Sequence, residues 1–502
     1  MVKILVFLIT FWVTINSVLA QTHVPDYAPA YDCNVPGKLT GFKFPNIPQA
    51  DKIILSIHNY NIDSNGVFNY SKAYTIQSKN KKKYVDNIII SPSSVKTVVE
   101  LPAFNMGYTW QVAYYKQGKV LSVSPILRFH VNLPPSFDTN RLRLRVLQRD
   151  TTMRNYYMLL DGNKALYNKR GELIWYLPSV EGIDNNAVMI RDLKMSCFNS
   201  LTFLNGDNAY EIDYYGTLKW KAPYDSTRRP QRQENYHHDF TRLPNGNYMT
   251  MSNDYITPPG DTAPKPYTTL MEYNAEGKVV WQWHATAFYL NTPPYYPQRA
   301  NGKREKTLHG NAFAFDAVHK YVYVSFKNSC IVAKIKYPEG IVETEIGKKY
   351  TPEDAYSDND FFCEQHNINI SPHGYLYMYN NNLCHNTQPP TIVFLRQSQP
   401  FSNYEKIKEL PVAVSNPMLP NPRRPELTQG GSVNEVFDDC YFVANCNPYT
   451  NLFIMDKQGK LLWNALPEYY DLATNKWLAL PSYRAFIIPD KKTLYKLILA
   501  PL

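Results

Sequence analysis

The stretch Gly216-Thr217-Leu218-Lys219-Trp220 starts with a glycine and ends with a tryptophan four positions later. It follows an alternating strand, Ala209-Tyr210-Glu211-Ile212-Asp213, so we expect the glycine in a hairpin turn, where a positive φ is tolerated. The pattern returns at residues 171–175, 277–281 and 459–463; Gly340 keeps the turn without the tryptophan, and a degenerate copy lies at 404–410. Six copies, each with room for four strands, are typical of a six-bladed β-propeller. A solenoid is the alternative, but it would need polar capping repeats.

Composition and charge exclude some classes of protein. The chain has 502 residues, of which 44% are hydrophobic and 19% are charged, and its 53 Lys and Arg against 43 Asp and Glu leave a net charge of +10. These values are typical of a globular protein and exclude a disordered or fibrous chain. The excess of positive charge allows acidic partners but does not by itself indicate one. We expect no nucleic-acid partner.

The first twenty residues are predicted to be a signal peptide. Lys3 precedes an apolar run over residues 4–13, and Ser17-Val18-Leu19-Ala20 has the small residues of a cleavage site. A buried N-terminal strand is the alternative. No later stretch reaches the length of a membrane span, so no membrane anchor is expected. We therefore expect a periplasmic or secreted protein whose cysteines meet an oxidising compartment.

Residues 21–134 are predicted to form a separate immunoglobulin-like β-sandwich. Short alternating segments recur there between turns rich in proline and serine; they cover residues 52–57, 87–90, 97–101 and 108–112. Pro134-Pro135 marks the expected linker, which assigns residues 135–502 to the propeller. The predicted fold class is all-β, a sandwich followed by a six-bladed propeller.

Seven cysteines leave at least one thiol unpaired within the chain. Residues 365–379 alternate like a hairpin. If His373 and Gly374 are its two loop residues, opposed positions sum to 747 and Cys363 faces Cys384. We expect a disulfide between these two, and the pairing of the other cysteines is left open.

Three histidines begin hairpins at one phase of the repeat. They are His238, His309 and His366, each roughly 30 to 40 residues before the closing glycine turn of its repeat. Other repeats carry Asn199 or Ser432 at the position of these histidines. In a propeller the first strands of the blades line the central channel, so equivalent positions converge. A single histidine is more often structural, but three at one phase favour a site. The remaining histidines show no such phase and are interpreted as structural or exposed.

Converging imidazoles suit either a metal ion or an anion. Three histidines can form an open zinc site, but no carboxylate or further histidine has the spacing to support such ligands. Asn311 and Lys327 lie near the motifs, and amide and ammonium donors suit a tetrahedral oxyanion. A neutral imidazole is also a nucleophile toward a sulfuryl or phosphoryl centre near pH 7. We expect no metal and no cofactor.

These motifs resemble those of the bacterial aryl-sulfate sulfotransferases, exported enzymes that do not use the nucleotide sulfate donor. The resemblance rests on four segments: Tyr236-His237-His238-Asp239, His309-Gly310-Asn311, Cys363-Glu364-Gln365-His366-Asn367 and Tyr483-Arg484-Ala485. It implies a β-sandwich, a six-bladed propeller and no cofactor.

The resemblance also implies roles for single residues. His366 would be the nucleophile that accepts a sulfuryl group from a phenolic sulfate ester and becomes a sulfohistidine. A phenol would then take the group in a second half-reaction, which is ping-pong chemistry. His238 and His309 would bind sulfuryl oxygens and help to move the phenol proton, with Asn311 as a further donor.

The chain departs from the family pattern in places. Lys327 stands where the family usually has an arginine, so the bidentate guanidinium contact is lost. Asn367 stands where a small or hydroxylated residue is expected. Arg484 is a candidate sulfate ligand or a structural arginine that closes the last repeat. Several tyrosines near the motifs fit a phenol pocket or simple packing: Tyr236, Tyr377 and Tyr379.

Two functions of different class remain. The first is sulfuryl transfer between two small molecules, an aryl sulfate donor and a phenol acceptor. The second is a non-catalytic secreted propeller that binds glycans or proteins, because one fold serves many functions. The natural donor and acceptor are left open, and so is a homodimer.

Overall fold

The computed structural model describes most of the chain between Asp26 and Leu502. Outside the description lie residues 1–25, 61–87, 92, 135–136, 150–154, 181–182, 184–189, 207, 224–235, 292, 294–306, 348–360, 383–388, 400–402, 413–429, 438 and 447–449. The predicted signal peptide and Cys384 therefore fall outside the described residues. The described elements are strands apart from two short helices, α2 (Thr286–Tyr289) and α3 (Lys491–Leu499). This confirms the all-β class.

The chain divides into two compact units. One comprises the described parts of Met1–Phe137 with Ile174–Pro178 and Leu494–Leu502, and the other comprises Asp138–Leu173 and Ser179–Thr493. The boundary expected at residues 134–135 stays a prediction. Neither described helix has the length and apolarity that crossing a membrane would require.

Two sheets form the body of the first unit. The larger has the order β1-β8-β6-β3-β4, with β7 also paired to β6, and the smaller consists of β2 and β5. Phe42 of β2 contacts Trp110 of β6 and Phe129 of β8, with ring centroids 5.2 and 5.8 Å apart, so the two sheets pack through buried aromatic rings. The bounds are β1 (Cys33–Asn34), β2 (Leu39–Lys43), β3 (Lys52–Tyr60), β4 (Ile88–Ile90), β5 (Lys96–Glu100), β6 (Met106–Lys116), β7 (Lys119–Val123) and β8 (Leu127–Val131). The four segments that the alternation predicted correspond to β3, β4, β5 and β6.

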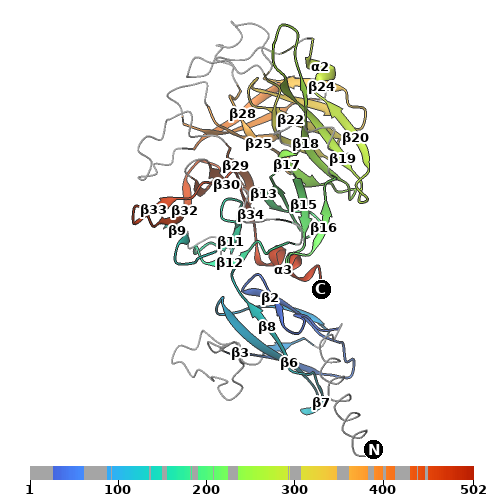
Figure 1. The fold of residues 1–502 in the computed structure, drawn as a ribbon, viewed down its shortest axis with the longest axis vertical. Coiled ribbons are helices and arrows are strands. Elements are labelled where there is room, and N and C mark those ends of the chain that lie inside the picture. Colours follow the sequence, from blue (N-terminus) through green and yellow to red (C-terminus); the bar gives the residue numbers. More distant parts are fainter. Residues whose placement is uncertain are drawn as a thin grey trace, which may run out of the picture. The chain divides into compact units, whose positions relative to one another are not determined.

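The described strands that follow form six antiparallel sheets (Figure 1). Their orders are β12-β11-β10-β34, β13-β14-β15-β16, β17-β18-β19-β20, β21-β22-β23-β24, β25-β26-β27-β28 and β29-β30-β31-β32-β33, with β9 added to β32. The bounds in the first three sheets are β10 (Tyr157–Leu160), β11 (Ala165–Asn168), β12 (Leu173–Tyr176), β34 (Ala485–Ile488), β13 (Ile190–Met195), β14 (Leu201–Asn205), β15 (Asn208–Ile212), β16 (Leu218–Lys221), β17 (His237–Arg242), β18 (Tyr248–Ile256), β19 (Lys265–Tyr273) and β20 (Val279–His284). Those in the last three are β21 (Gly310–Asp316), β22 (Tyr321–Phe326), β23 (Ile331–Lys336), β24 (Val342–Ile346), β25 (His366–Ile370), β26 (Leu376–Asn380), β27 (Thr391–Gln397), β28 (Tyr404–Pro411), β29 (Ser432–Val436), β30 (Cys440–Asn445), β31 (Asn451–Met455), β32 (Leu461–Asp471), β33 (Lys476–Ala479) and β9 (Leu142–Gln148).

The repeated glycine lies in the turn before the outermost repeat strand, as predicted. Gly216 has φ +90° between β15 and β16, and Gly459 has φ +83° between β31 and β32. Three residues before each glycine, an Asp side chain accepts from backbone N–H groups of the turn, as Asp213 does from Tyr215 at 2.9 Å and Asp456 from Gln458 at 2.9 Å. These Asx turns explain why an Asp or Asn and a Gly recur at this spacing.

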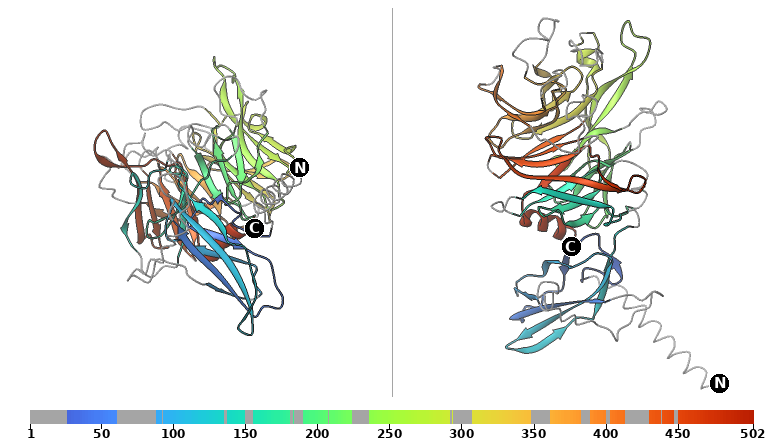
Figure 2. Two further views of the ribbon diagram at one scale, coloured as in Figure 1. Left: turned by 60° about the horizontal axis from the view of Figure 1, so that its bottom comes forward. Right: turned by 90° about the vertical axis from the view of Figure 1, so that its left-hand side faces the viewer.

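The first strands of the six sheets contact one another in order. β13 contacts β17, β17 contacts β21, β21 contacts β25 and β25 contacts β29, while β34 contacts both β29 and β13. β34 (Ala485–Ile488) pairs with β10, with Ala485 opposite Leu160. The right-hand view of Figure 2 shows red strands next to teal ones in this unit. The last strand therefore completes the sheet that begins the series.

Side chains of these first strands also bond to the backbone of the next sheet. Asp192 accepts from Phe240 N–H at 3.0 Å and Asp239 from Phe313 N–H at 3.3 Å. Farther along, Asn311 donates to the Gln365 carbonyl at 2.7 Å, and the Asn367 carboxamide oxygen accepts from Val433 N–H at 2.8 Å. The series is completed by Ser432, which bonds to Ala485, and by Asp161, which accepts from the N–H groups of Arg484 and Asp192.

Four buried charges lie where these links meet. Arg484 Nη1 is 2.7 Å from Asp192 and 3.1 Å from Asp239, and Lys194 Nζ is 2.7 Å from each of the same two carboxylates. The Arg484, Asp192 and Asp239 side chains are at most 6% exposed. A buried charge is tolerated only when it is paired, so the four groups depend on one another.

Removal of the Arg484 charge should destabilise the fold. Arg484→Met leaves two buried carboxylates with one cation, and we expect the free energy of unfolding to fall by about 3 to 5 kcal/mol. Urea denaturation measures the change. Lys265→Met, which removes an exposed partner 2.7 Å from Asp261, is the matched control and should cost less than about 1 kcal/mol. Equal effects of the two substitutions would contradict the assignment.

Candidate active site

A bulge interrupts each of four consecutive first strands at a corresponding place. The pairing register shifts between Arg191 and Lys194 in β13, between His237 and Phe240 in β17, between Gly310 and Ala312 in β21, and between His366 and Asn369 in β25. Within three of these bulges one residue has a left-handed backbone: Asp192 (φ 56°), His238 (φ 62°) and Asn367 (φ 48°). Such strained, bulged positions re-aim side chains and are common at functional sites.

The bulge of β17 and the start of β21 bring three imidazoles together. The His237 ring is stacked on His309 with centroids 4.4 Å apart and an interplanar angle of 26°. His238 is edge-on to both, at 4.9 Å from His237 and 4.6 Å from His309. Asn253 Oδ1 lies 3.3 Å from His309 Nδ1 and can accept a hydrogen bond from it. The predicted pair His238 and His309 is thus in contact, with His237 as a third member.

His366 lies across a tyrosine ring from this cluster. Tyr483 is 5.6 Å from the His238 centroid and 6.4 Å from that of His366, edge-on to each. His366 Nδ1 is 2.7 Å from Asn381 Oδ1, and the Asn381 amide donates to the Gly430 carbonyl at 2.9 Å, which fixes that oxygen toward the ring. Nδ1 therefore carries the proton, and the Nε2 lone pair of His366 is free to act as a nucleophile.

Burial keeps these rings neutral. It lowers the pKa of His366 to about 3, with help from the nearby Lys327 charge, and the pKa of His237 to about 4, with help from Arg191. Burial, followed by the charges of neighbouring histidines and Arg191, also holds the pKa of His238 well below its usual range. Uncharged rings are the form in which imidazole acts as a nucleophile or a base.

Charges of both signs lie around the rings. Lys327 Nζ is 3.5 Å from Glu364 and close enough to His366 to lower its pKa, and Arg191 lies 5.9 Å from the Tyr483 ring. Asp192 and Asp239 are paired with Lys194 and Arg484.

A metal and an anion make different demands on this arrangement. His237, His238 and His309 each offer a ring nitrogen within 4.8 Å of the others, so by distance alone they could gather a metal ion. The neighbouring Arg191 and Lys327 charges would repel a divalent cation and attract an anion. On this ground an anion fits the arrangement better than a metal ion, and the kind of ligand stays a prediction.

Two predicted ligands have structural contacts. Arg484 donates through Nη2 to the Asn311 carbonyl at 2.8 Å, and its other terminal nitrogen lies between the two buried carboxylates. These contacts favour the alternative of a structural arginine. The Asn311 amide donates to Gln365, the residue before His366, so it holds the strand of the nucleophile. Its Oδ1 atom is buried without a partner among the described residues.

Sequence reasoning missed His237 and Arg191. Neighbouring residues of a regular strand point to opposite faces, so two adjacent histidines were not expected in one cluster; only the bulge allows it. Asn199 was aligned with the site histidines, but it lies in the turn between β13 and β14. Arg191 immediately precedes the bulge of β13, as His237 does in β17. A search for charged or aromatic residues next to Asp192 and Asp239 would have found Arg191.

The hairpin that begins at His366 differs in register from the prediction. Opposed positions sum to 746 where Ile370 faces Leu376 and to 745 where His366 faces Tyr379, rather than to 747. The loop has three residues, Pro372-His373-Gly374, closed by a bond from Gly374 N–H to the Ser371 carbonyl, and the bulge adds the second shift.

Cys363 lies at the base of this hairpin. It is disulfide-bonded, and its N–H donates to Asn380 Oδ1 at 2.9 Å while its carbonyl accepts from Asn382 N–H at 3.1 Å. Five other cysteines of the described part of the chain are in no disulfide: Cys33, Cys197, Cys330, Cys440 and Cys446. Because Cys384 is outside the described residues, the pair Cys363–Cys384 stays a prediction.

The tyrosines near the motifs pack within the sheets. Tyr236 is bonded through its hydroxyl to the Pro223 carbonyl at 2.7 Å, and Tyr377 is stacked on Phe394 with centroids 6.2 Å apart. Tyr379 is fully buried and bonded to Asn445. These contacts favour packing over a phenol pocket.

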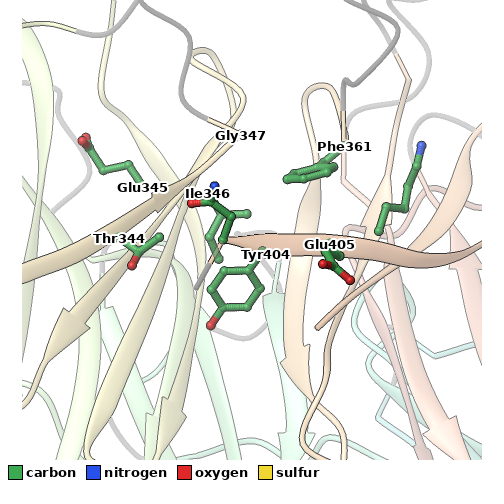
Figure 3. Close-up of a pocket in the computed structure, with 9 residues that line it drawn as sticks. Thr344, Glu345, Ile346, Gly347, Phe361, Tyr404 and Glu405 are labelled. Carbon is green, nitrogen blue, oxygen red and sulfur yellow. The ribbon is translucent and has the colours of Figure 1, made fainter. Parts of the chain in front are cut away.

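A hollow with a volume of about 600 Å³ lies between β24 and β28. Phe361 and Tyr404 line it together with Ile346, and Glu345 and Glu405 are at its border (Figure 3). These residues lie at or beside the outermost strands of two sheets, whereas the histidines lie on or beside first strands. We assign it no role in the chemistry.

Comparison with known proteins adds a family. The profile of the arylsulfotransferase (ASST) family matches residues 145–407, which is just over half of the chain and includes all the histidines of the site. None of the curated proteins matches.

Solved structures show only distant similarity. A Bacteroides caccae protein of unknown function has 13% identity and a TM-score of 0.38, over 70% of this chain and all of that one. A putative 6-phosphogluconolactonase from Bacteroides fragilis has 14% identity and a TM-score of 0.33, over 71% of this chain and all of that one. A Lactobacillus plantarum protein has 12% identity and a TM-score of 0.32, over 69% and 99%. At these values the similarities support no further conclusion.

The buried neutral His366 should make stability sensitive to acid. Its pKa is about 3 in the folded protein and near 6.5 when unfolded, so below pH 6.5 the unfolded chain binds more protons and stability falls. When the pH is lowered from 7 to 4.5, the free energy of unfolding should fall in both proteins. The fall should be about 2 to 3 kcal/mol smaller in His366→Asn than in the wild type. Urea denaturation at both pH values measures the difference.

The matched control is His58→Asn, which changes an exposed ring. It should lose as much stability as the wild type over the same pH interval. If His366→Asn behaves in the same way as this control, the His366 ring is not kept neutral by the fold.

Proposed function

Because the chain belongs to the arylsulfotransferase family, we propose that it moves a sulfuryl group from a phenolic sulfate ester to a phenol through a sulfohistidine at His366. The observation that carries this proposal is the contact between His366 Nδ1 and Asn381 Oδ1, because it leaves Nε2 unprotonated and nucleophilic. A covalent intermediate on a neutral imidazole divides the transfer into two half-reactions.

In the first half-reaction, His366 Nε2 attacks the sulfur of the donor. The N–S bond forms, the bond from sulfur to the phenolic oxygen breaks, and the phenolate leaves with the electron pair. The Nδ1 proton stays on the ring, so the sulfohistidine carries a positive ring and a negative sulfonate. Asn381 stabilises the charge that develops on the ring by accepting from Nδ1.

In the second half-reaction, the oxygen of an acceptor phenol attacks the same sulfur. The O–S bond forms, the S–N bond breaks, and the electron pair returns to His366. The phenol proton must go to a base, and neutral His238 or the adjacent His309 can receive it. Both rings lie in the cluster that Tyr483 separates from His366.

Three residues are proposed to hold the sulfuryl oxygens, namely His309, Asn311 and Lys327, and His238 is assigned to the phenol proton. The positive charge around the rings supports this assignment. Lys327 supplies one ammonium where the family usually has a guanidinium, so it offers a point charge rather than a fork. Arg191 is a further cation of the site that can compensate for the lost contact.

The architecture is proposed to be a six-bladed propeller preceded by an immunoglobulin-like sandwich, over residues 135–502 and 21–134. The propeller is supported by six sheets of four or more strands whose first strands contact in order, with β34 between β29 and β13. Export to the periplasm or beyond, after removal of residues 1–20, is also part of the proposal and is supported by the sequence of that segment.

The covalent intermediate gives the most direct test. Incubation with a chromogenic aryl sulfate in the absence of a phenol should add the mass of one sulfuryl group to the peptide that contains His366, and addition of phenol should remove it. His366→Asn should show neither the added mass nor phenol-dependent release of the chromophore. Equal turnover in this variant would refute the mechanism. If the wild type turns over no donor, the non-catalytic binding protein becomes the better hypothesis.

Lys327 should contribute to binding of the donor anion. Lys327→Met is expected to raise the KM for the aryl sulfate by about 10-fold or more, because a hydrogen bond to a charged group contributes about 1.5 to 3 kcal/mol. Lys327→Arg should keep the KM at or below that of the wild type. Steady-state kinetics with both variants checks this, and an unchanged KM in Lys327→Met would exclude the contact.

A further inference from the structure

His237 and His238 share a contact that constrains both rings. Their Nδ1 atoms are 2.8 Å apart, a hydrogen-bond distance. Only one proton can lie between two such nitrogens, so one ring donates through Nδ1 and the other accepts. In the neutral state the donating ring then has a lone pair on Nε2, whereas the accepting ring carries its proton there.

The surroundings of His237 decide which ring donates. Burial keeps the pKa of His237 at about 4, so at neutral pH the ring has a single proton. The Ser252 carbonyl and the Asn253 side chain lie beside the ring and favour protonation of it. Because Nδ1 already faces His238, the Ser252 and Asn253 oxygens lie on the side of Nε2. Neither forms a hydrogen bond with Nε2, which is buried without a partner among the described residues, but a proton on Nε2 is favoured over a lone pair that faces two oxygens. His237 Nδ1 is then the acceptor.

The packing holds His237 in this orientation. The residue is 1% exposed, and its ring lies parallel to His309 at 4.4 Å. The left-handed φ of 62° at His238 allows the two successive side chains to meet. Rotation of either ring would require the bulge of β17 to change.

We propose that His237 is a positioning residue that fixes His238 with its proton on Nδ1 and a lone pair on Nε2, which makes His238 the base for the acceptor phenol. This inference rests on the proposed function and adds a direction of proton flow to it. As the phenol oxygen bonds to sulfur and the S–N bond breaks, the phenol proton moves to His238 Nε2. His238 becomes an imidazolium that still donates to His237 Nδ1, and it later releases the proton to water.

The test compares acceptors that need a base with acceptors that do not. In His237→Leu, transfer to phenol should fall by about 100-fold or more, the usual contribution of a general base. Transfer to 4-nitrophenol, which is largely ionised at mildly alkaline pH, should fall by no more than a few-fold. The single-turnover release of leaving group from a fluorogenic aryl sulfate should also be nearly unchanged.

Two conservative variants separate the two nitrogens of the ring. Asn places an oxygen near the position of Nδ1, so His237→Asn should restore most of the transfer to phenol. Gln places its amide near Nε2, so His237→Gln should not. Equal losses with both acceptors, or a slow donor half-reaction, would overturn the proposal, because a purely structural residue affects every step.

A measurement on the wild-type protein keeps the inference testable if the variants do not fold. Long-range ¹H–¹⁵N NMR correlations with ¹⁵N-histidine labelling identify the tautomer of each ring, and His238→Gln assigns the signal. A proton on Nδ1 of His238 supports the proposal, and a proton on Nε2 overturns it. If no sulfuryl transfer is found with any acceptor, the proposed function fails, and the tautomer still decides whether His237 orients His238.

Discussion

The ion cluster of Arg484, Lys194, Asp192 and Asp239 is the constraint on which the second unit depends. Two carboxylates and two cations are held with little access to water, at 2.7 to 3.1 Å. Burial and the neighbouring Asp239 raise the pKa of Asp192, whereas Lys194 and Arg484 outweigh the burial of Asp239 and lower its pKa. An unpaired member would carry a large desolvation penalty, so the strands that supply the four groups must come together as a set.

The same constraint positions the candidate site, because each of three buried charges is next in sequence to a residue of the site. Arg191 precedes Asp192, His238 precedes Asp239, and Tyr483 precedes Arg484. One member of each pair enters the ion cluster and the other faces the histidines. Asp192 and Asp239 lie within the bulges of β13 and β17, which re-aim the side chains there, whereas Tyr483 and Arg484 immediately precede β34.

Local sequence predicted the elements and part of the site. The Asp-x-x-Gly turns and the alternating segments follow from φ preferences and burial, so β15, β16 and the strands β3 to β6 of the first unit could be expected. The common phase of His238, His309 and His366 in the repeat pointed to convergence. The contacts of His237 and Arg191 could not be predicted, because they depend on bulges whose positions are set by partners on other strands. The same holds for the hairpin at His366, where a three-residue loop replaced the expected two.

The place of β34 has a consequence for the order in which the protein can become active. Ribosomes make the histidine-bearing strands β17 and β25 well before residues 484–488. Until residues 483–488 appear, Asp192 and Asp239 share only Lys194, β10 lacks its partner β34, and Tyr483 is missing from between His238 and His366. The arrangement of the candidate site is therefore completed only after these residues have been synthesised. A chain that stops before residue 483 has all the histidines of the site but lacks the groups that hold them in place.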